Sequence, residues 1–428
     1  MVARRVAWHN PMWRRTFSTT ASRLEVLDVA QLADRIIPKY QESNTSDLLA
    51  LKWPSPPRNV LMVKKSGSQD VTDSLLEYAR YIHSNYDDVS LIFEPEVAAA
   101  LHQSFSYPIY TTHSQSVLPR KVDMTTTLGG DGTILHASSF FSTATHVPPI
   151  LSFSMGTLGF LGEWKFLEFK RAFREVYMSG AVAGSHLLSR EQNIPEADTQ
   201  MSEEVGDITG WSSIRGKSMG STRSSKVLMR NRLRVGVFGV DGQRISRNNT
   251  EESAAGDIHA MNEVIIHRGA NPHLAIIEVF VGGRFLTEAV ADGMIISTPT
   301  GSTAYSLSSG GSIIHPLVSS LLLTPICPRS LSFRPLVLPA NTPVTLRLSE
   351  KNRGRELDVS IDGKRHEKGV GVGMEVRVLG EDVKQGDGNW IGGVPCVVRG
   401  TKAGLEDDDG WVGGLNGLLK FNYPFGEE

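Results

Sequence analysis

The chain has few cysteines, no long apolar run and almost no net charge. Only Cys327 and Cys396 occur among 428 residues, so neither a disulfide framework nor a cysteine zinc cluster is available. No run of about 18 consecutive apolar residues could form a membrane span. The formal net charge of −2 argues against nucleic acid as a partner, because proteins that bind it are usually visibly basic. The 40% of hydrophobic residues suffices for the cores of two domains.

Acidic residues are missing from the N-terminus, where the first is Glu25. Residues 1–24 instead carry five arginines and a run of hydroxyl residues after the second arginine pair. An Arg-rich, Ser-rich and acid-free composition is typical of an organellar transit peptide. We expect import into the mitochondrial matrix and cleavage shortly after the segment Arg15-Thr16-Phe17. A disordered basic tail is the alternative.

One glycine-rich stretch, Leu128 to Leu135, fits neither the Rossmann nor the Walker spacing. Gly129, Gly130 and Gly132 surround a single ionisable side chain, Asp131. A short strand at 125–128, mostly threonine, precedes them and a helical segment follows, an arrangement in which backbone N–H groups and a helix N-terminus can bind phosphate oxygens. The alternative is a tight turn in which Asp131 caps the helix.

The region before and around this stretch reads as an α/β domain at 58–164. The spacing of Leu24, Leu27, Leu32 and Ile36 indicates a helix before it. Within it, alternating apolar runs and helical spacing predict a parallel sheet. The expected strands are at 60–63, 89–93, 125–128 and 148–153, with a helix at 73–84. Asp131 would then lie at the carboxyl end of a strand, where open α/β sheets bind ligands.

A β-rich second domain is expected at 165–400. The stretch 164–178 has the spacing of one amphipathic helix. After it, alternation predicts strands within 227–240, 275–285, 344–348, 359–361 and 376–378. Aperiodic polar stretches near 192–225 and 242–257 predict two disordered insertions. The last segment, 401–428, has apolar residues at helical spacing and is expected to pack back on the core.

Two more motifs lie in the second domain. Asn262 and Glu263 stand together at a strand start, where an amide and a carboxylate can bind paired ribose hydroxyls; a strand-edge pair is the alternative. The stretch 291–308 joins a strand to a loop dense in hydroxyl groups, with Tyr305 able to stack on a base. A flexible Ser/Thr linker is the alternative to a binding loop.

The three motifs, in this order, resemble the NAD kinase family, and 128–160 and 261–339 in particular resemble the mitochondrial NADH kinases of fungi. The resemblance covers about 58–425 apart from the insertions. It implies ATP-dependent phosphorylation, with Mg²⁺, of the 2′-hydroxyl on the adenosine ribose of NADH and NAD⁺. It also implies a C-terminal domain like a β-sandwich, a dinucleotide held between the domains, and a homo-oligomer. The chain departs from the family in lacking an Asn before Gly156.

The resemblance also implies residue roles. Asp131 would contact the 2′-hydroxyl and take its proton, beside a phosphate-facing loop shaped by Gly129, Gly130, Gly132 and Thr133. Asp292 would face the nicotinamide end, in some relatives across a subunit interface, with Val290 as a candidate for specificity between NADH and NAD⁺. Further contacts would come from His136, Asn262, Glu263, His273, Thr303, Ala304, Tyr305, Ser306 and Ser308. No direct metal ligand is identified.

Two other functions share part of this pattern. A lipid or sphingoid kinase can carry GGDGT, but it would need neither the Asn262-Glu263 pair nor the TPTGSTAY loop at 298–305. A non-catalytic dinucleotide-binding protein would not need Asp131.

Overall fold

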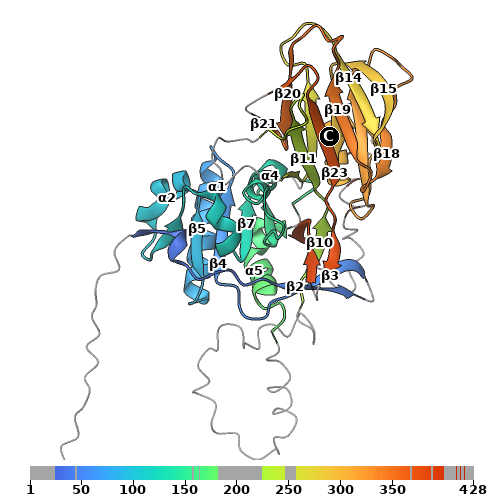
Figure 1. Cartoon of the computed structure of the whole chain (residues 1–428). Helices are drawn as coiled ribbons and strands as arrows, with labels where there is room; N and C mark the ends of the chain where they lie inside the picture. Colours follow the sequence, from blue (N-terminus) through green and yellow to red (C-terminus); the bar gives the residue numbers. More distant parts are fainter. Residues whose placement is uncertain are drawn as a thin grey trace, which may run out of the picture.

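The computed structural model describes residues 25–43, 46–156, 159–162, 164–181, 224–245, 257–366, 369–386 and 389–399, together with Trp411, Leu415 and Leu419. It consists of an α/β domain and a β-sandwich (Figure 1). The expected transit peptide lies outside the described residues, as do residues 192–223 and 246–256 of the expected insertions. Of the last segment only three residues are described, and the Trp411 ring meets the His315 ring edge-on at 4.6 Å.

The α/β domain is built on an 11-stranded sheet with the order β1-β6-β5-β4-β7-β8-β26-β10-β3-β2, and β9 pairs with β8. Pairing is parallel from β1 to β26 and antiparallel from β26 to β2. The strands are β1 (Val26–Asp28), β2 (Lys39–Ser43), β3 (Ser46–Lys52), β4 (Asn59–Lys64), β5 (Ser90–Phe93), β6 (Ile109–Thr111), β7 (Met124–Leu128), β8 (Ile150–Ser154), β9 (Trp164–Lys165), β10 (Lys226–Arg230) and β26 (Val394–Val397).

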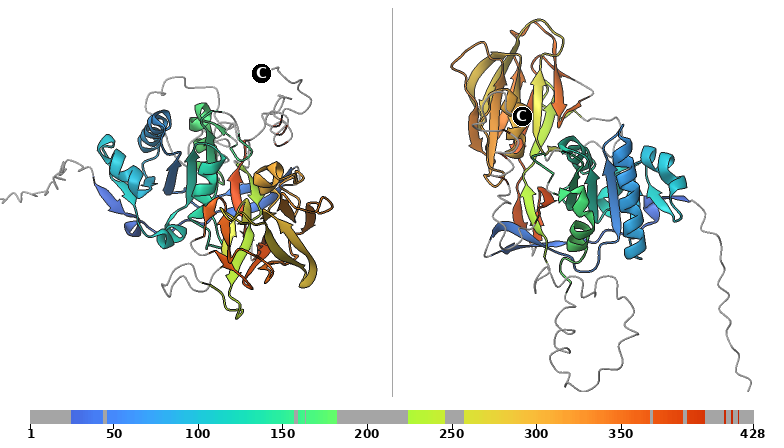
Figure 2. Two further views of the ribbon diagram at one scale, coloured as in Figure 1. Left: turned by 90° about the horizontal axis from the view of Figure 1, so that it is seen from above. Right: turned by 180° about the vertical axis from the view of Figure 1, so that it is seen from behind.

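Helices cover both faces of this sheet (Figure 2). In β4, Val60 and Met62 pack in the same core as Tyr78 of α1, while Leu61 and Val63 pack with Ile134 of α4. Because successive strand residues point to opposite faces, a strand buried on both sides must be apolar throughout. The helices are α1 (Gln69–Asn85), α2 (Pro95–Leu101), α3 (Leu118–Lys121), α4 (Asp131–Ser139) and α5 (Phe169–Tyr177), with 3₁₀ turns at 29–31, 102–104, 115–117 and 166–168.

The sheet reverses its winding at β4. From β4 the chain moves outward to β5 and β6, then returns to place β7 on the other side of β4. Such a switch point leaves a crevice at the carboxyl ends of the two strands, where ligands bind in open α/β sheets. Gly129, Gly130 and Asp131 follow β7 at this point, which confirms the expected position of the motif.

The β-sandwich packs two antiparallel sheets around one apolar core. One sheet has the order β12-β11-β23-β19-β14-β15 and the other β18-β17-β16-β13-β20-β21, with β22 beside β20. The strands are β11 (Leu233–Phe238), β12 (Ile258–Ala260), β13 (Glu263–His267), β14 (Ala275–Val281), β15 (Arg284–Ala291), β16 (Gly293–Ser297), β17 (Ser320–Ile326), β18 (Leu336–Pro339), β19 (Val344–Leu348), β20 (Glu356–Ile361), β21 (Lys364–Arg365), β22 (Val370–Gly371) and β23 (Glu375–Gly380). A hairpin of β24 (Lys384–Gly386) and β25 (Asn389–Ile391) follows.

The chain passes between the domains twice, and a buried ion pair joins the two crossings. It leaves the first sheet after β10 and returns through 381–393 to β26. Arg232 donates to both oxygens of Glu381, at 2.7 and 2.6 Å, and to the carbonyls of Phe141 and Ala144 beyond α4. Burial pushes the pKa of Glu381 up, but the Arg232 guanidinium outweighs it and holds that pKa below its usual value. The crossings are therefore tied to each other and to the segment after α4.

The structure corrects three expectations about the domains. The boundaries at 58 and 164 are wrong, because β2, β3, α5, β10 and β26 all belong to the first domain. The helix expected from Leu24 to Ile36 is absent from the described part of that region, since β1 gains a parallel ladder with β6 that an isolated short helix lacks. The helix expected at 164–178 begins only at Phe169, because Trp164 pairs with Phe153 as strand β9.

Candidate active site

The glycine turn after β7 brings an acid to the start of α4. A Cβ at Gly129 would lie 2.3 Å from Oγ1 of Thr133, so no other residue fits there without displacing that side chain. Gly130 is the N-cap of α4, and its carbonyl accepts from the Thr133 N–H at 2.9 Å. Asp131 is the first helical residue, and its carboxylate accepts from the loop after β8 rather than from the first turn of α4, which argues against the alternative of a simple cap.

The Asp131 carboxylate is held by the loop after β8. Its Oδ2 accepts from the Phe160 N–H at 3.0 Å and its Oδ1 from the Leu161 N–H at 3.1 Å. A Cβ at Gly159 would lie 2.1 Å from Oδ1, so the absence of a side chain there makes room for the acid. Two backbone donors leave further lone pairs of the carboxylate available to a ligand hydroxyl. The acid is thus aimed by backbone alone.

The Asn262-Glu263 pair starts β13 and is positioned by Asp362. The N–H groups of Met261, Asn262 and Glu263 donate to the Asp362 carboxylate at 2.7, 2.8 and 3.1 Å. Both pair members are buried, yet Asn262 Oδ1 and Glu263 Oε2 accept no hydrogen bond from the described part of the chain. Buried polar atoms without a protein partner indicate a place where a ligand or water binds.

The Glu263 carboxyl also has an unusually high pKa. Burial, reinforced by the neighbouring Asp362, raises the pKa of Glu263 to about 8. Burial raises the pKa of Asp362 as well, against the lowering effect of its three backbone donors. At neutral pH the Glu263 side chain is therefore mostly a carboxylic acid. It can donate one hydrogen bond and accept others, whereas an ionised carboxylate could only accept.

The hydroxyl-rich loop after β16 rests on the Asn262-Glu263 segment. Thr298 donates from Oγ1 to the Met261 carbonyl at 2.6 Å and from N–H to the Asn262 carbonyl at 2.8 Å. A Cβ at Gly301 would lie 2.2 Å from that same Asn262 carbonyl, so the loop can approach only with glycine there. The loop forms a 3₁₀ turn, η7 (Thr300–Thr303), and a short helix, α7 (Tyr305–Ser308).

The predicted residues of this loop divide into exposed and internally bonded ones. Tyr305 is 40% exposed, and Ser308 is also on the surface. Ser306, by contrast, is fully buried and shares a 2.8 Å hydrogen bond with the Thr324 hydroxyl of β17. Its hydroxyl is used within the fold, so its position argues for a supporting role.

Arg230 joins the two motifs. This buried residue at the end of β10 donates from Nη2 to the Phe160 carbonyl and from Nη1 to Thr300 Oγ1, each at 3.4 Å. Phe160 belongs to the loop that holds Asp131, and Thr300 to the loop that rests on Asn262. One guanidinium thus spans the boundary between the acid of the α/β domain and the polar pair of the sandwich.

His136 lies farther along α4 and bridges the domains in a different way. Its Nε2 is 2.6 Å from Glu94 Oε1, and its Nδ1 is 3.5 Å from Nζ of Lys364 on β21. Lys364 also donates to Ser139 Oγ at 2.6 Å. His136 lies five positions after Asp131 in α4, which is about 7.5 Å along the helix axis. The His136 imidazole therefore lies near Asp131, but its two ring nitrogens already contact Glu94 and Lys364.

Asp292, His273 and Val290 are not brought to Glu263. Strands β13 and β16 pair so that Glu263 faces Ser297 and His267 faces Gly293. Asp292 precedes Gly293, so it lies beyond the opposite end of this ladder, about 14 Å or more from Glu263 at the usual strand rise. Asp292 is paired with Arg268 at 2.6 Å, and His273 and Val290 lie near the same end.

Sequence reasoning missed four residues at the site, Lys65, Gly159, Arg230 and Asp362. Lys65 follows β4 at the switch point, and its N–H donates to the Leu128 carbonyl at 2.8 Å, directly beside Gly129. An Asp-Gly pair between alternating residues is a hairpin signal that could have singled out Asp362. No sequence motif around Arg230 indicated that it would lie at the site.

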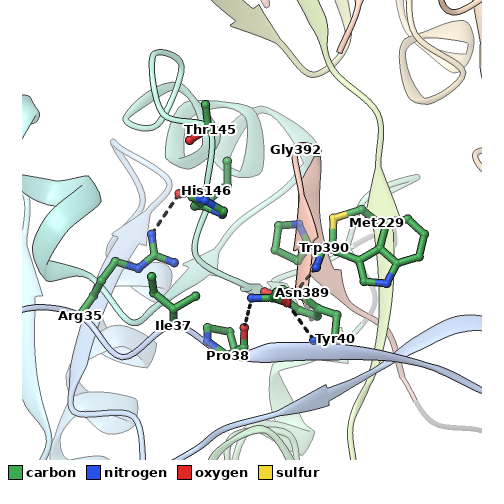
Figure 3. Close-up of a pocket in the computed structure, with 13 residues that line it drawn as sticks. Arg35, Ile37, Pro38, Tyr40, Thr145, His146, Met229, Asn389, Trp390 and Gly392 are labelled. Atoms are coloured by element: carbon green, nitrogen blue, oxygen red, sulfur yellow. Dashed lines mark hydrogen bonds between the residues drawn. The ribbon is translucent and has the colours of Figure 1, made fainter. Parts of the chain in front are cut away.

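The small cavity drawn in Figure 3 lies elsewhere and is structural. It has about 10 Å³ of room, close to one water molecule. Around it, Asn389 donates to the Pro38 carbonyl at 2.9 Å and accepts from the Tyr40 N–H at 3.3 Å, while Arg35 donates to the His146 carbonyl at 3.0 Å. The Asn389 bonds fasten the start of β2 to the returning chain, and the Arg35 bond fastens the segment before β2 to the segment after α4.

Comparison with known proteins shows which family the chain belongs to. Residues 68–181 match the ATP-NAD kinase N-terminal domain and residues 261–379 the ATP-NAD kinase C-terminal domain. The chain is 40% identical to a mitochondrial NADH kinase of Schizosaccharomyces pombe, over 93% of this chain and 85% of that one. It belongs to the NAD kinase family.

Other NAD kinase family members agree over the whole length. The mitochondrial NADH kinase of Saccharomyces cerevisiae is 32% identical, covering 98% of this chain and 97% of its own. A crystal structure of yeast NADH kinase complexed with NADH has a TM-score of 0.73 and 33% identity, covering 94% and 97% of the two chains. The α/β domain followed by a β-sandwich is therefore the family fold, and a lipid or sphingoid kinase is excluded.

No helix among the described residues is long and apolar enough to cross a membrane. Within the same residues, no three His, Cys, Asp or Glu side chains gather as a metal site would require.

Proposed function

We propose that the chain transfers the γ-phosphoryl group of ATP to the 2′-hydroxyl on the adenosine ribose of NADH, and more slowly of NAD⁺. Membership of the NAD kinase family supports phosphorylation of NAD(H). The observation that carries the residue assignment is the Arg230 bridge, since it joins the loop that holds Asp131 to the loop that rests on Asn262. A ribose bound at the pair would thus present its hydroxyl toward the acid.

The dinucleotide is recognised by the sandwich. Asn262 and Glu263 each offer a buried oxygen with no partner among the described residues, and these would bind the ribose hydroxyls and adenine edge. Thr303, Ala304 and Tyr305 would line the adenine pocket, with Ser308 at its rim. Glu263, protonated at neutral pH, would donate to a ligand oxygen. A non-catalytic binding protein would need this half of the site but not an acid held by two backbone donors.

The chemistry requires a base and charge neutralisation. A ribose hydroxyl is a poor nucleophile at neutral pH, so Asp131 would accept its proton as the phosphoryl group moves in line. Mg²⁺ enters with ATP, because it prefers one or two carboxylates plus substrate phosphates to an all-protein cage. Among the protein groups, the Lys65 side chain and the N–H groups of the glycine turn would bind the phosphate oxygens of ATP.

The preference for NADH rests on the relatives and on the nicotinamide end. The two kinases most fully compared above are named NADH kinases. Asp292 alone would favour the cationic ring of NAD⁺, but its ion pair with Arg268 offsets that attraction, while Val290 suits a neutral ring. Tenfold selectivity needs only about 1.4 kcal/mol of differential transition-state binding.

The test is to measure kcat/KM with NADH and NAD⁺ side by side. We expect a higher value with NADH and measurable activity with both. Val290→Arg should change the ratio. An equal or higher value with NAD⁺ would overturn the preference and leave the kinase assignment standing.

A second copy of the chain would cover an exposed edge strand of the sandwich. The resemblance to the family implies that the acid at the position of Asp292 acts across a subunit interface in some relatives, and Asp292 lies beyond the end of the β13–β16 ladder opposite Glu263. Edge strand β15, whose last residue precedes Asp292, exposes Phe285 and Leu286 at its opposite end, at 59% and 46%. Light scattering of the purified protein should therefore show a homo-oligomer. For location, the composition of residues 1–24 and the relatives' mitochondrial naming support import into the matrix.

A further inference from the structure

Arg230 is a buried cation placed between the two halves of the site. It is 2% exposed, although arginine is rarely buried without a specific role. It ends β10, where it pairs with Val394 of β26, so its backbone is fixed by the ladder of the large sheet. A rigid strand end of this kind can hold a side chain more precisely than a loop can.

One arm of Arg230 reaches the acid through a single peptide group. Nη2 donates to the Phe160 carbonyl, and the N–H of the same peptide, on Leu161, donates to Asp131 Oδ1. The Phe160 N–H donates to the other oxygen. A donor on a carbonyl polarises its peptide and strengthens the hydrogen bond made by the N–H. The guanidinium therefore fixes and strengthens the backbone hydrogen bonds that hold the Asp131 carboxylate, although it does not contact the carboxylate itself.

The other arm reaches the dinucleotide loop. Nη1 donates to Thr300 Oγ1, and Gly301 next to it lies directly against the Asn262 carbonyl. If the loop at 298–308 moves when the dinucleotide binds, it would therefore shift the Arg230 guanidinium, which fixes the peptide group that holds Asp131.

We propose that Arg230 is a positioning residue that couples the dinucleotide loop to the orientation of Asp131. The inference rests on the proposed role of Asp131 as base. Lysine cannot replace it, since an ammonium lacks the planar fork that bonds two acceptors at once. Arg232, two residues on, makes the contrast: it is equally buried, but its guanidinium is bound to Glu381 and to backbone beyond α4.

The experiment is a double-mutant cycle on the full chain, with Arg230→Lys and Asp131→Asn. In the wild-type background, Arg230→Lys should lower kcat by about 10- to 100-fold, the cost of a misplacement of about 1 Å, and change the KM for NADH much less. In the Asp131→Asn background the same substitution should lower kcat less than threefold. Equal losses in both backgrounds, or an unchanged kcat, would overturn the proposal.

Thr300→Val covers the case in which Arg230→Lys folds poorly. It removes one acceptor and leaves the charge in place, and thermal melting with NADH titration checks the fold of every variant. In the Asp131→Asn background, Thr300→Val should lower kcat much less than it does in the wild type. An equal loss in both backgrounds would contradict the coupling. Failure of the proposed function looks different, because the wild type itself would then form no NADPH.

Discussion

Replacing Glu263 by Gln should stabilise the ligand-free protein, and by an amount that depends on pH. The folded carboxyl keeps its proton up to about pH 8, whereas in the unfolded chain it ionises near 4.5. The folded state therefore binds more protons between these values, and its stability falls as pH rises through this window. At pH 7 the penalty amounts to about 3.5 kcal/mol, from about 1.4 kcal/mol per pH unit over about 2.5 units.

Glutamine keeps the shape and removes the ionisation. Urea denaturation of both proteins without ligand should show a difference in unfolding free energy that grows by about 1.4 kcal/mol per pH unit between pH 5 and 7.5 and levels off above pH 8. Glu77→Gln, on the exposed face of α1, is the matched control and should show no such growth. A difference for Glu263→Gln that is constant across this range would refute the reasoning about its buried carboxyl.

Four further outcomes are expected. Asp131→Asn should lower kcat by roughly 10²–10⁴-fold while the affinity for NADH changes much less; a near-normal kcat would leave the acid only a positioning role. Gly159→Ala should lower kcat by about 10-fold or more, since its Cβ would fall on Asp131 Oδ1, whereas Gly162→Ala, whose Cβ makes only a 3.8 Å contact, should have little effect. Lys65→Met should raise the KM for ATP several-fold and leave that for NADH unchanged; equal increases would exclude a donor-side role. Removing residues 2–24 should leave kcat unchanged and move a fluorescent fusion from mitochondria to the cytosol, and mitochondrial signal that persists would refute targeting.

Local patterns predicted the elements whose signal is local. The apolar run at 60–63 appears as β4 because a strand covered on both faces must be apolar throughout. The position of Asp131 after β7 also followed from local order, since a strand, a glycine turn and a helix are adjacent in the chain. The resemblance to a family added the roles, which no spacing could supply.

Features that depend on distant pairing could not be predicted. The first sheet takes β26 and β10 from residues beyond the expected boundary, because sheet edges accept any strand with a suitable face and register. The same holds for Arg230, which contacts loops far from it in the sequence, and for Asp362, which reaches the Asn262-Glu263 pair only because β20 pairs with β13. The separation of Asp292 from Glu263 follows from the register of β13 and β16, which alternation alone does not determine.

The most direct test of the account is the position of the transferred phosphate. Purified protein is incubated with Mg²⁺, γ-labelled ATP and NADH, and the product is identified by mass spectrometry and ³¹P NMR. The account predicts labelled NADPH with the phosphate on the adenosine 2′-oxygen, formed at a rate strongly reduced by Asp131→Asn. Label on any other oxygen, or no labelled dinucleotide from folded protein that binds NADH, would contradict it.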